Sequence, residues 1–286
     1  MLRSGTARLR RHSHIHLLLH DMPDNEILIR VGAFLLCLLL LLGWEHVAPR
    51  RPVLSHHTLR RINNLALILI SIIIIQLLPL LALAGMATLA TERSLGLFNN
   101  IDLPFWLMVV LSMIVLDLTI YWQHRLFHKY EWLWRLHRVH HCDQEFDVTT
   151  GIRFHPLELI ISVLVKSLVI VLIGAPAVAV VLFEVVLNIL PMFNHSNVRI
   201  PRPIDKILRK IIVTPDMHRV HHSVIRDETN SNFCFSVPWW DHVFHSYRDQ
   251  PREGHDNMHI GLEEFRGSET ILLHKLLIQP FRRSSP

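Results

Sequence analysis

Histidines in a repeated spacing are the residues of this sequence best suited to chemistry. The stretch HRLFHKYEWLWRLHRVHH holds five histidines between His124 and His141, and its final H-R-V-H-H returns at residues 218–222. With 22 histidines among 286 residues, about 0.13 copies of H-x-x-H-H are expected by chance, whereas two are present. Imidazole is the commonest metal ligand in proteins, so the pattern indicates a metal site.

Helical geometry turns these spacings into faces that could bind metal. His124 and His128 lie about 40° apart around a helix, and each triplet spans about 100°. The triplets are His137, His140 and His141, and His218, His221 and His222. Eight imidazoles exceed the roughly four to six ligands of one ion, so we expect two metal ions, and the spacing alone fits iron, zinc or copper.

Two kinds of reaction fit a pair of histidine-bound metals. Activation of O2 against an unreactive C–H bond suits a dimetal centre beside lipid. A zinc hydrolase would instead need an open water position and a carboxylate base, which Asp143 or Glu145 could supply. The residues favour oxygen chemistry and leave the hydrolase open.

The composition places these histidines in a membrane protein. Half of the residues are hydrophobic and the mean hydropathy is +0.31, and the apolar residues come in long blocks. Cys37, Cys142 and Cys234 form no C-x-x-C pair, so neither a disulfide framework nor a thiolate zinc site is expected. The net charge of +5 fits anionic lipid rather than nucleic acid.

Four apolar blocks must position the site. Residues 31–44 are shorter than the roughly 20 residues of a span, so we expect a short apolar helix that does not cross, and no signal peptide. Residues 65–90 and 104–122 are each long enough to span. Residues 156–191 are interrupted by Gly174-Ala175-Pro176, which predicts a hairpin that returns to the face it left.

Arginine placement predicts the topology. Arginines precede the first block at Arg3, Arg8, Arg10 and Arg11 and follow it at Arg50, Arg51, Arg60 and Arg61. The positive-inside rule then places both flanks in the cytoplasm, with the first block re-entrant or interfacial. The alternative puts the N-terminus outside. Both arrangements place the histidine motifs on the cytoplasmic face.

Charged residues within the blocks need partners. Asp117 lies two helical turns before His124, where a carboxylate could accept the second ring N–H of a ligating histidine; capping or bound water is the alternative. Lys166 and Glu184 lie nine residues on either side of Ala175. We predict that they pair across the hairpin, the alternative being a Lys166 that extends to the interface.

Isolated histidines are expected to be interfacial rather than ligands. These are His12, His14, His16, His20, His46, His56, His57 and His274.

The motifs from Asp117 to Tyr247 resemble the sterol desaturase and fatty acid hydroxylase superfamily of integral membrane, non-heme diiron oxygenases. The matching segments are D-x-x-x-Y-W-x-H-R-L-F-H, H-R-V-H-H, R-F-H-P-L-E, N-H-S-N-V-R-I-P, T-P-D-M-H-R-V-H-H, N-S-N-F and W-D. The resemblance implies that His155 and His195 join the eight motif histidines as ligands. It also implies supporting roles for Asn197, Asp216, Asn232 and Asp241.

The resemblance implies an all-α fold, an integral membrane bundle of about four spanning or hairpin helices plus the short N-terminal helix. A cytoplasmic histidine-rich helical domain would cap it and hold two irons, which zinc could replace on overexpression. The oxidant would be O2, and the substrate a sterol, fatty acyl, sphingoid or alkylglycerol lipid that is hydroxylated or desaturated. The membrane would be the inner membrane in a bacterium or the endoplasmic reticulum in a eukaryote. We divide the chain into a membrane region (1–103), a catalytic domain (104–247) and a C-terminal tail (248–286).

Two departures from the family pattern affect one loop. Cys234 and His245 stand where the family usually has glycine, which removes backbone freedom there. Activity is still expected, because the core histidines are all present. His242 and His245 are read as extra histidines rather than ligands.

Electrons would come from another protein, such as a cytochrome b5, a ferredoxin or a reductase. The sequence has neither a dinucleotide fingerprint nor the H-P-G-G heme motif. Arg135, Arg138 and Arg219 could face an acidic donor or lipid headgroups. A metal transporter would place its ligands within the spans, and an inactive scaffold would be expected to have lost ligands, so both classes are disfavoured.

Overall fold

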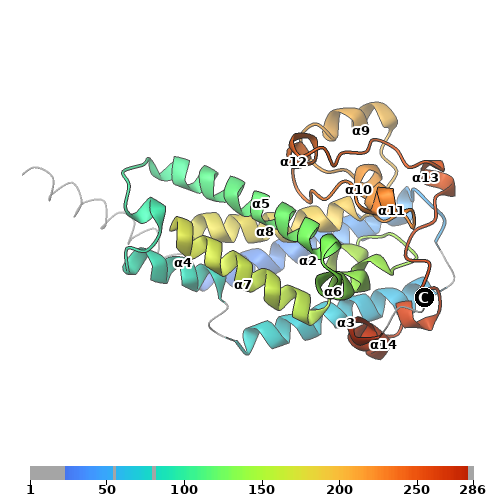
Figure 1. Cartoon of the computed structure of the whole chain (residues 1–286), viewed down its shortest axis with the longest axis horizontal. Coiled ribbons are helices and arrows are strands. Elements are labelled where there is room, and N and C mark those ends of the chain that lie inside the picture. The colour runs from blue at the N-terminus through green and yellow to red at the C-terminus, as the bar shows by residue number, and fades with distance from the viewer. Residues whose placement is uncertain (1–22, 54–55, 79–81, 283–286) are drawn as a thin grey trace, which may run out of the picture.

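A computed structural model describes residues 23–53, 56–78 and 82–282, and helices joined by loops make up this part of the chain, without strands. Five of its helices are long and apolar enough to cross a membrane, consistent with a multi-pass membrane protein. They are α2 (Pro23–Val47), α3 (His57–Gln76), α5 (Phe105–Lys129), α7 (Pro156–Ile173) and α8 (Ala177–Asn194). They lie side by side as one bundle (Figure 1). The predicted all-α membrane bundle is confirmed.

The first apolar block is longer than we expected. Helix α2 carries a 21-residue apolar segment from Ile27 to Val47, because Arg30 and Glu45 continue the helix instead of bounding it. Arg30 forms an ion pair with Glu184 at 3.0 Å. Glu45 accepts the backbone N–H groups of Val148 and Asn197 at 2.7 and 2.8 Å. Distant partners therefore satisfy both charges, and the prediction of a short helix is wrong.

Helix α2 runs parallel to α8. Along the pair, Arg30 meets Glu184 and Cys37 approaches the carbonyl of Ile189. Helix α2 therefore starts near the hairpin turn and ends beside the histidine motifs. This contradicts the re-entrant or interfacial placement predicted from the arginines. Arg3, Arg8, Arg10 and Arg11 themselves lie outside the described residues.

The second apolar block forms two helices rather than one. Helix α3 ends at Gln76, and the ten-residue α4 (Leu83–Glu92) begins after residues 79–81, which lie outside the described part. The intervening Pro79 has no N–H and clashes with a preceding turn, so the sequence disfavours a continuous helix there. The third block is confirmed as α5, which continues to Lys129 and so carries His124 and His128.

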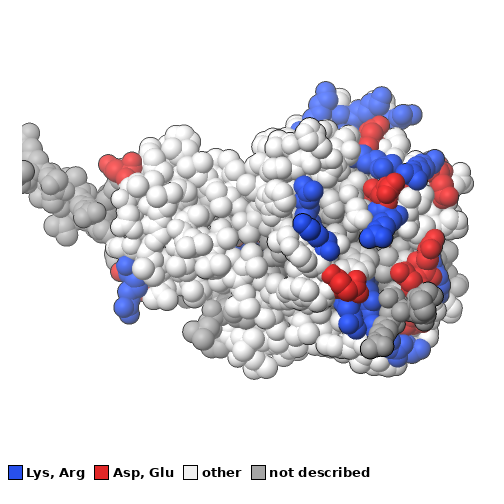
Figure 2. Space-filling view, viewed as in Figure 1, with Lys and Arg blue, Asp and Glu red and all other residues white. Residues whose placement is uncertain are grey.

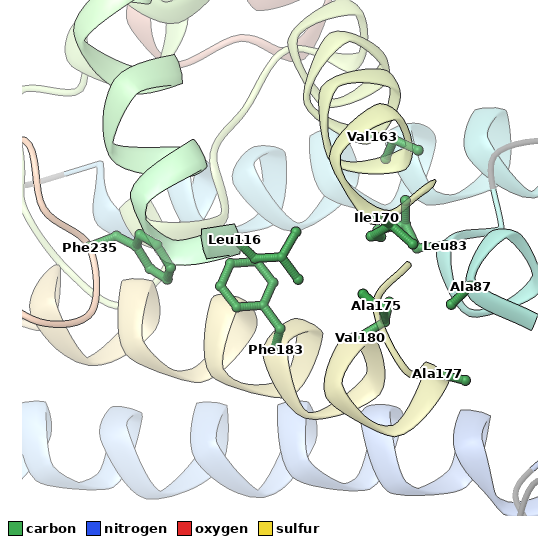
Figure 3. Close-up of a cluster of buried hydrophobic side chains, with 10 residues drawn as sticks. All are labelled: Leu83, Ala87, Leu116, Val163, Ile170, Ala175, Ala177, Val180, Phe183 and Phe235. Atoms are coloured by element: carbon green, nitrogen blue, oxygen red, sulfur yellow. The ribbon is translucent and has the colours of Figure 1, made fainter. Parts of the chain in front are cut away.

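The predicted hairpin is confirmed as α7 and α8. Gly174 ends α7 in the left-handed region, at φ 68° and ψ 46°, which is the usual role of glycine after a helix. Each arm has 18 residues, enough to cross rather than dip. Side chains of α4, α5, α7 and α8 form the apolar core, with Leu116 and Phe183 at its centre (Figure 3).

The predicted contact of Lys166 and Glu184 is not a direct ion pair. Both side chains are buried, Glu184 pairs with Arg30, and no ion pair of Lys166 exists within the described residues. The charge of Glu184 still acts on Lys166, so the two hairpin arms do bring these residues near each other. The sequence argument considered only the two hairpin arms, whereas α2 also packs against α8.

Short helices cap the histidine end of the bundle. They are α6 (Glu131–His141), α9 (Arg202–Leu208), α10 (Pro215–His221), α11 (Arg226–Thr229), α12 (Trp239–Val243), α13 (Gly254–Asn257) and α14 (Leu273–Ile278). The 3-10 turns are η2 (Leu97–Asn99), η3 (Thr150–Ile152), η4 (Ser268–Thr270) and η5 (Gln279–Phe281). Figure 2 shows most charged side chains gathered over this end, while the visible flank of the bundle carries almost none. The cap is thus the polar part of the molecule.

Candidate metal centre

Nine histidines converge at the capped end of the bundle in two groups. In each group the potential ligand atoms all lie within 4.8 Å of one another. The first group contains His124, His128, His137, His141 and His221, and the second contains His140, His195, His218 and His222. Helices α5, α6 and α10 and the residue after α8 supply them.

The two H-x-x-H-H motifs share their histidines between the groups in a reciprocal way. The first and last histidines of the α6 motif, His137 and His141, join the first group, while His140 joins the second. In the motif at the end of α10, the first and last histidines, His218 and His222, join the second group, while His221 joins the first. The rings of His141 and His222 stack at 4.5 Å. Each motif therefore links the two groups, and neither group forms without both helices.

The spacing of the ring nitrogens fits bound metal ions. The Nε2 atom of His141 lies 3.1 Å from that of His128 and 3.2 Å from that of His137. In the second group the Nε2 atom of His195 lies 3.1 Å from those of His140 and His222. Two nitrogens each about 2.1 Å from one ion are about 3.1 Å apart when they subtend about 95° at it. The residues thus fit two ions, one for each group.

Hydrogen bonds orient five of these rings. The Nδ1 atom of His137 lies 2.6 Å from the Glu158 carboxylate, and that of His128 lies 3.3 Å from the Asn230 side-chain oxygen. Backbone carbonyls, each 2.7 Å from Nδ1, serve the other three: Phe233 for His124, Pro191 for His195 and Ser231 for His221. A proton on Nδ1 leaves Nε2 as a lone pair directed into the group, which is how proteins commonly fix metal-binding histidines.

Burial keeps the imidazoles outside the spans neutral. Desolvation lowers the pKa of His137 to about 3, and it lowers the pKa of His195 to about 3 as well. Desolvation and neighbouring imidazoles hold the pKa of the other five cap histidines well below its usual value; these are His140, His141, His218, His221 and His222. Neutral imidazole is the form that binds metal.

The groups differ in accessibility. The second group is buried throughout, whereas His124 and His128 of the first are only partly buried. The Nδ1 atoms of His140, His218 and His222 are buried without a protein hydrogen-bond partner. The first group is thus the more open of the two.

His155 does not join either group. Its Nδ1 accepts the backbone N–H of Leu157, which caps α7, and its Nε2 lies 3.1 Å from the carbonyl of Leu277. Both ring nitrogens are therefore engaged elsewhere. His46, His56, His57, His242, His245 and His274 also lie outside both groups, whereas His12, His14, His16 and His20 fall outside the described residues.

The supporting residues act mainly through the backbone. Asp117 accepts hydrogen bonds from Ser236 and Trp240 and contacts no histidine, because a carbonyl already occupies Nδ1 of His124. Asp241 accepts the N–H groups of Phe233 and Cys234, and so holds the carbonyl that His124 uses.

The other residues predicted to support the site, Asn232, Asn197 and Asp216, bond the surrounding segments and not the imidazoles or their acceptors. Asn232 bonds the carbonyls of Met217 and Arg248. Asn197 pairs with the backbone of Arg51. Asp216 pairs with Arg219 and Arg50. These contacts fix the loops around the site rather than the imidazoles.

Sequence reasoning missed Glu158 and Asn230 as ring acceptors. Glu158 lies in the R-F-H-P-L-E segment, and an acid in the first turn of an apolar helix was a signal that could have identified it. The three carbonyl acceptors leave no signal in the sequence, because any residue supplies a carbonyl.

Other charged residues near the site form ion pairs or hydrogen bonds with the surrounding protein and not with the imidazoles. Asp143 bonds Arg60 at 2.6 Å, and Glu145 lies 3.6 Å from the same side chain, so neither is positioned as a base beside the imidazoles. Arg138 and Arg219 are buried and bonded within the protein, unlike the accessible cations expected for a donor surface.

Cys234 and His245 stand where the family usually has glycine, and only one of these two positions has a backbone conformation that favours glycine. His245 has φ 57°, in the left-handed region, as does Asn232 at 50°. Cys234 is buried and has no positive φ. Only the replacement at His245 therefore introduces local strain.

Comparisons with known proteins agree with this geometry. The fatty acid hydroxylase family matches residues 109–246, which confirms the resemblance drawn from the motifs. The chain is 28% identical to ornithine lipid hydroxylase OlsE of Rhizobium tropici over 63% of this chain and 52% of that protein.

The chain is also similar to alkylglycerol monooxygenase. It is 29% identical to the Homo sapiens protein over 46% of this chain and 28% of that protein, and 26% identical to the Danio rerio protein over 64% and 40%. The chain thus spans about half or less of the length of these curated relatives. No solved structure matches it significantly.

Proposed function

We propose that this chain, with its fatty acid hydroxylase segment at residues 109–246, is a membrane-bound oxidoreductase that hydroxylates a lipid. The convergence of nine imidazoles, seven of them buried, into two groups at one end of an apolar bundle carries the proposal. Two irons held there would supply the activation of O2 against an unreactive C–H bond. Zinc could replace them on overexpression.

The protein's own residues would orient and shield this centre. Glu158, Asn230 and the three carbonyls hold the Nδ1 protons, so that five Nε2 lone pairs stay fixed. Phe154 stacks on His140 at 4.6 Å, and Phe146 stacks on His195 at 5.3 Å, so aromatic rings exclude water from the second group. The more open first group, with His124 and His128 on a spanning helix, is where a lipid carbon would approach.

The substrate would be a lipid of the ornithine lipid or alkylglycerol type, after which the two relatives are named. An external protein would deliver the electrons. We place the histidine end on the cytoplasmic face because Arg50, Arg51, Arg60 and Arg61 follow α2 at that end. The membrane would be the inner membrane in a bacterium or the endoplasmic reticulum in a eukaryote.

Comparative lipid analysis tests the proposal. Cells expressing the chain under ¹⁸O2 should contain a lipid 18 mass units heavier than its precursor, and cells expressing His140→Ala should not; His274→Ala should behave like the original chain. Ornithine lipids and alkylglycerols would be supplied in separate cultures. Absence of any ¹⁸O-labelled lipid in both cultures, with a metal-loaded protein present, would leave an inactive scaffold as the better description.

A further inference from the structure

A second apolar surface lies outside the five spans. It consists of Ile204, Ile207 and Ile211 in and after α9, and Trp239 and Val243 in α12, and we name these residues the α9–α12 face. Their side chains are 51–64% exposed. Figure 2 shows charged side chains interspersed among uncharged ones over this end of the molecule. Several large apolar side chains exposed together on such a surface are characteristic of an interaction site.

Unpaired cations accompany these apolar residues. Arg202, Lys206 and Lys210 follow one another at four-residue intervals and are exposed. Two acids near the α9–α12 face, Asp205 and Asp249, both pair with Arg209. No ion pair of the three cations occurs among the described residues, so the surface carries a net positive charge.

A hollow lies between the two helices. Its volume is about 410 Å³, and Lys206, Ile207, Arg209, Lys210, His242 and Tyr247 line it. The indole N–H of Trp239 donates to the carbonyl of Lys210 at 3.0 Å, which holds α12 against the end of the α9 segment. This hydrogen bond fixes the two helices relative to each other, and cationic side chains line the hollow between them.

The depth of α12 relative to α5 places this face at the edge of the bilayer. Phe244, which follows α12, contacts the rings of Tyr121 and Trp122 at 5.4 and 4.9 Å. Tyr121 and Trp122 lie 16 and 17 residues after the start of α5 at Phe105. This is about 24–26 Å along the helix, just inside the far edge of a hydrocarbon core of about 30 Å. In Figure 1, α9 and α12 project sideways beyond the bundle at this level.

We propose that the α9–α12 face docks on the anionic phospholipid headgroups of the leaflet at the histidine end. The isoleucines, Trp239 and Val243 enter the interfacial layer, and Lys206 and Lys210 bind a lipid phosphate at the hollow. This docking does not depend on the proposed function, because a chain without turnover would bind lipid in the same way. It accounts for apolar and basic side chains exposed side by side.

Hydrogen–deuterium exchange of the full chain in nanodiscs tests the docking. Amides of residues 202–212 and 239–244 should exchange at least about tenfold more slowly when one third of the phosphatidylcholine is replaced by phosphatidylglycerol. A Lys206→Gln, Lys210→Gln double variant should lose most of this difference, since each basic residue near an anionic surface contributes about fivefold, or about 1 kcal/mol. Arg226→Gln with Arg252→Gln, a charge-matched control at α11 and after it, should retain the difference.

Three results would overturn the proposal. The exchange rates could be equal in the two lipids, or the double lysine variant could keep the full protection. Alternatively, added cytochrome b5 could protect these segments in phosphatidylcholine nanodiscs while phosphatidylglycerol does not, which would make the face a site for an acidic protein. An Ile207→Ser, Val243→Ser variant serves as a second probe, because it should weaken protection without changing charge.

Discussion

At the scale of single residues, each histidine motif contributes to both metal groups. His140 lies one residue from His141, yet their nitrogens belong to different groups. We therefore expect that His140→Ala lowers the metal content from about two ions per chain to about one, and that His155→Ala leaves about two. Metal analysis of purified protein measures this. Loss of metal in His155→Ala, or full content in His140→Ala, would contradict the division.

Among the described residues, Glu158 is the one carboxylate within hydrogen-bonding distance of a histidine of either group. It is buried, and its oxygen lies 2.6 Å from Nδ1 of His137. Glu158→Leu should lower the affinity of the first group for metal by about 10- to 100-fold, because His137 loses the acceptor that fixes its ring. Glu158→Gln, which keeps an acceptor oxygen, should lose less. The measurement is how much metal each variant retains against a chelator, with Glu131→Gln at the start of α6 as the control. Equal retention in Glu158→Leu and Glu158→Gln would argue against a role of Glu158 in orienting His137.

The strained backbone at His245 offers a stabilising substitution. Its φ of 57° costs a residue with a Cβ atom about 1–2 kcal/mol, and the side chain is exposed. His245→Gly should therefore raise the free energy of unfolding by about 1 kcal/mol, after the added freedom of the unfolded chain is subtracted. Thermal unfolding in detergent measures the change. His242→Gly, a helical position in α12, should instead lower stability, so a parallel loss at both positions would count against the strain.

At the scale of elements, the turn between α7 and α8 packs closely against the backbone just before η2. Gly96 has φ 86°, and a Cβ atom there would lie 2.2 Å from the backbone nitrogen of Gly174. Gly96→Ala should therefore separate η2 from the turn and cost about 3 kcal/mol or more. Gly43→Ala in α2, where nothing lies within 4 Å, should be neutral or stabilising. The yield of folded protein after detergent extraction measures both; similar yields for the two variants would refute the contact.

Local patterns predicted those elements whose determinants are close in sequence. The spacing of the histidines indicated their shared faces, and Gly174-Ala175-Pro176 marked the turn. Helix α2 was misjudged because the partner of Arg30, Glu184, is distant in the sequence. For the same reason the pairing of Lys166 with Glu184 could not be decided from the two arms alone.

The convergence of the motif histidines was predictable from the sequence, but the contacts that orient their rings were not. Eight motif histidines and His195 converge, whereas His155 caps α7. Asp117 bonds Ser236 of a distant loop and Trp240 of α12, and the acceptors of His124 and His221 are carbonyls of that loop. Such contacts depend on how the loop between α11 and α12 folds back over α5, which no local spacing encodes.

At the scale of the whole molecule, neutral histidines packed together should make the fold sensitive to acid. The pKa of His137 and of His195 is about 3 in the folded protein, whereas it is about 6.5 in an unfolded chain. Between these values the unfolded chain binds more protons, so stability falls as the pH drops below about 6.5 and stops falling from these two groups below about 3. At pH 5.5 each of these two histidines should lower the free energy of unfolding by about 1.4 kcal/mol relative to its value at neutral pH.

Unfolding temperatures measured at pH 7.5, 6.5 and 5.5 test this expectation. We expect little change between the first two values and a marked fall at pH 5.5, above the range in which ordinary carboxylates titrate. Metal-loaded protein should show a steeper fall than metal-free protein, because protons also compete with the ions for the imidazoles. His274→Gln, which removes a histidine outside both groups, should leave the profile unchanged. An unfolding temperature that stays constant down to pH 5.5 would mean that the buried imidazoles are not held neutral by the fold.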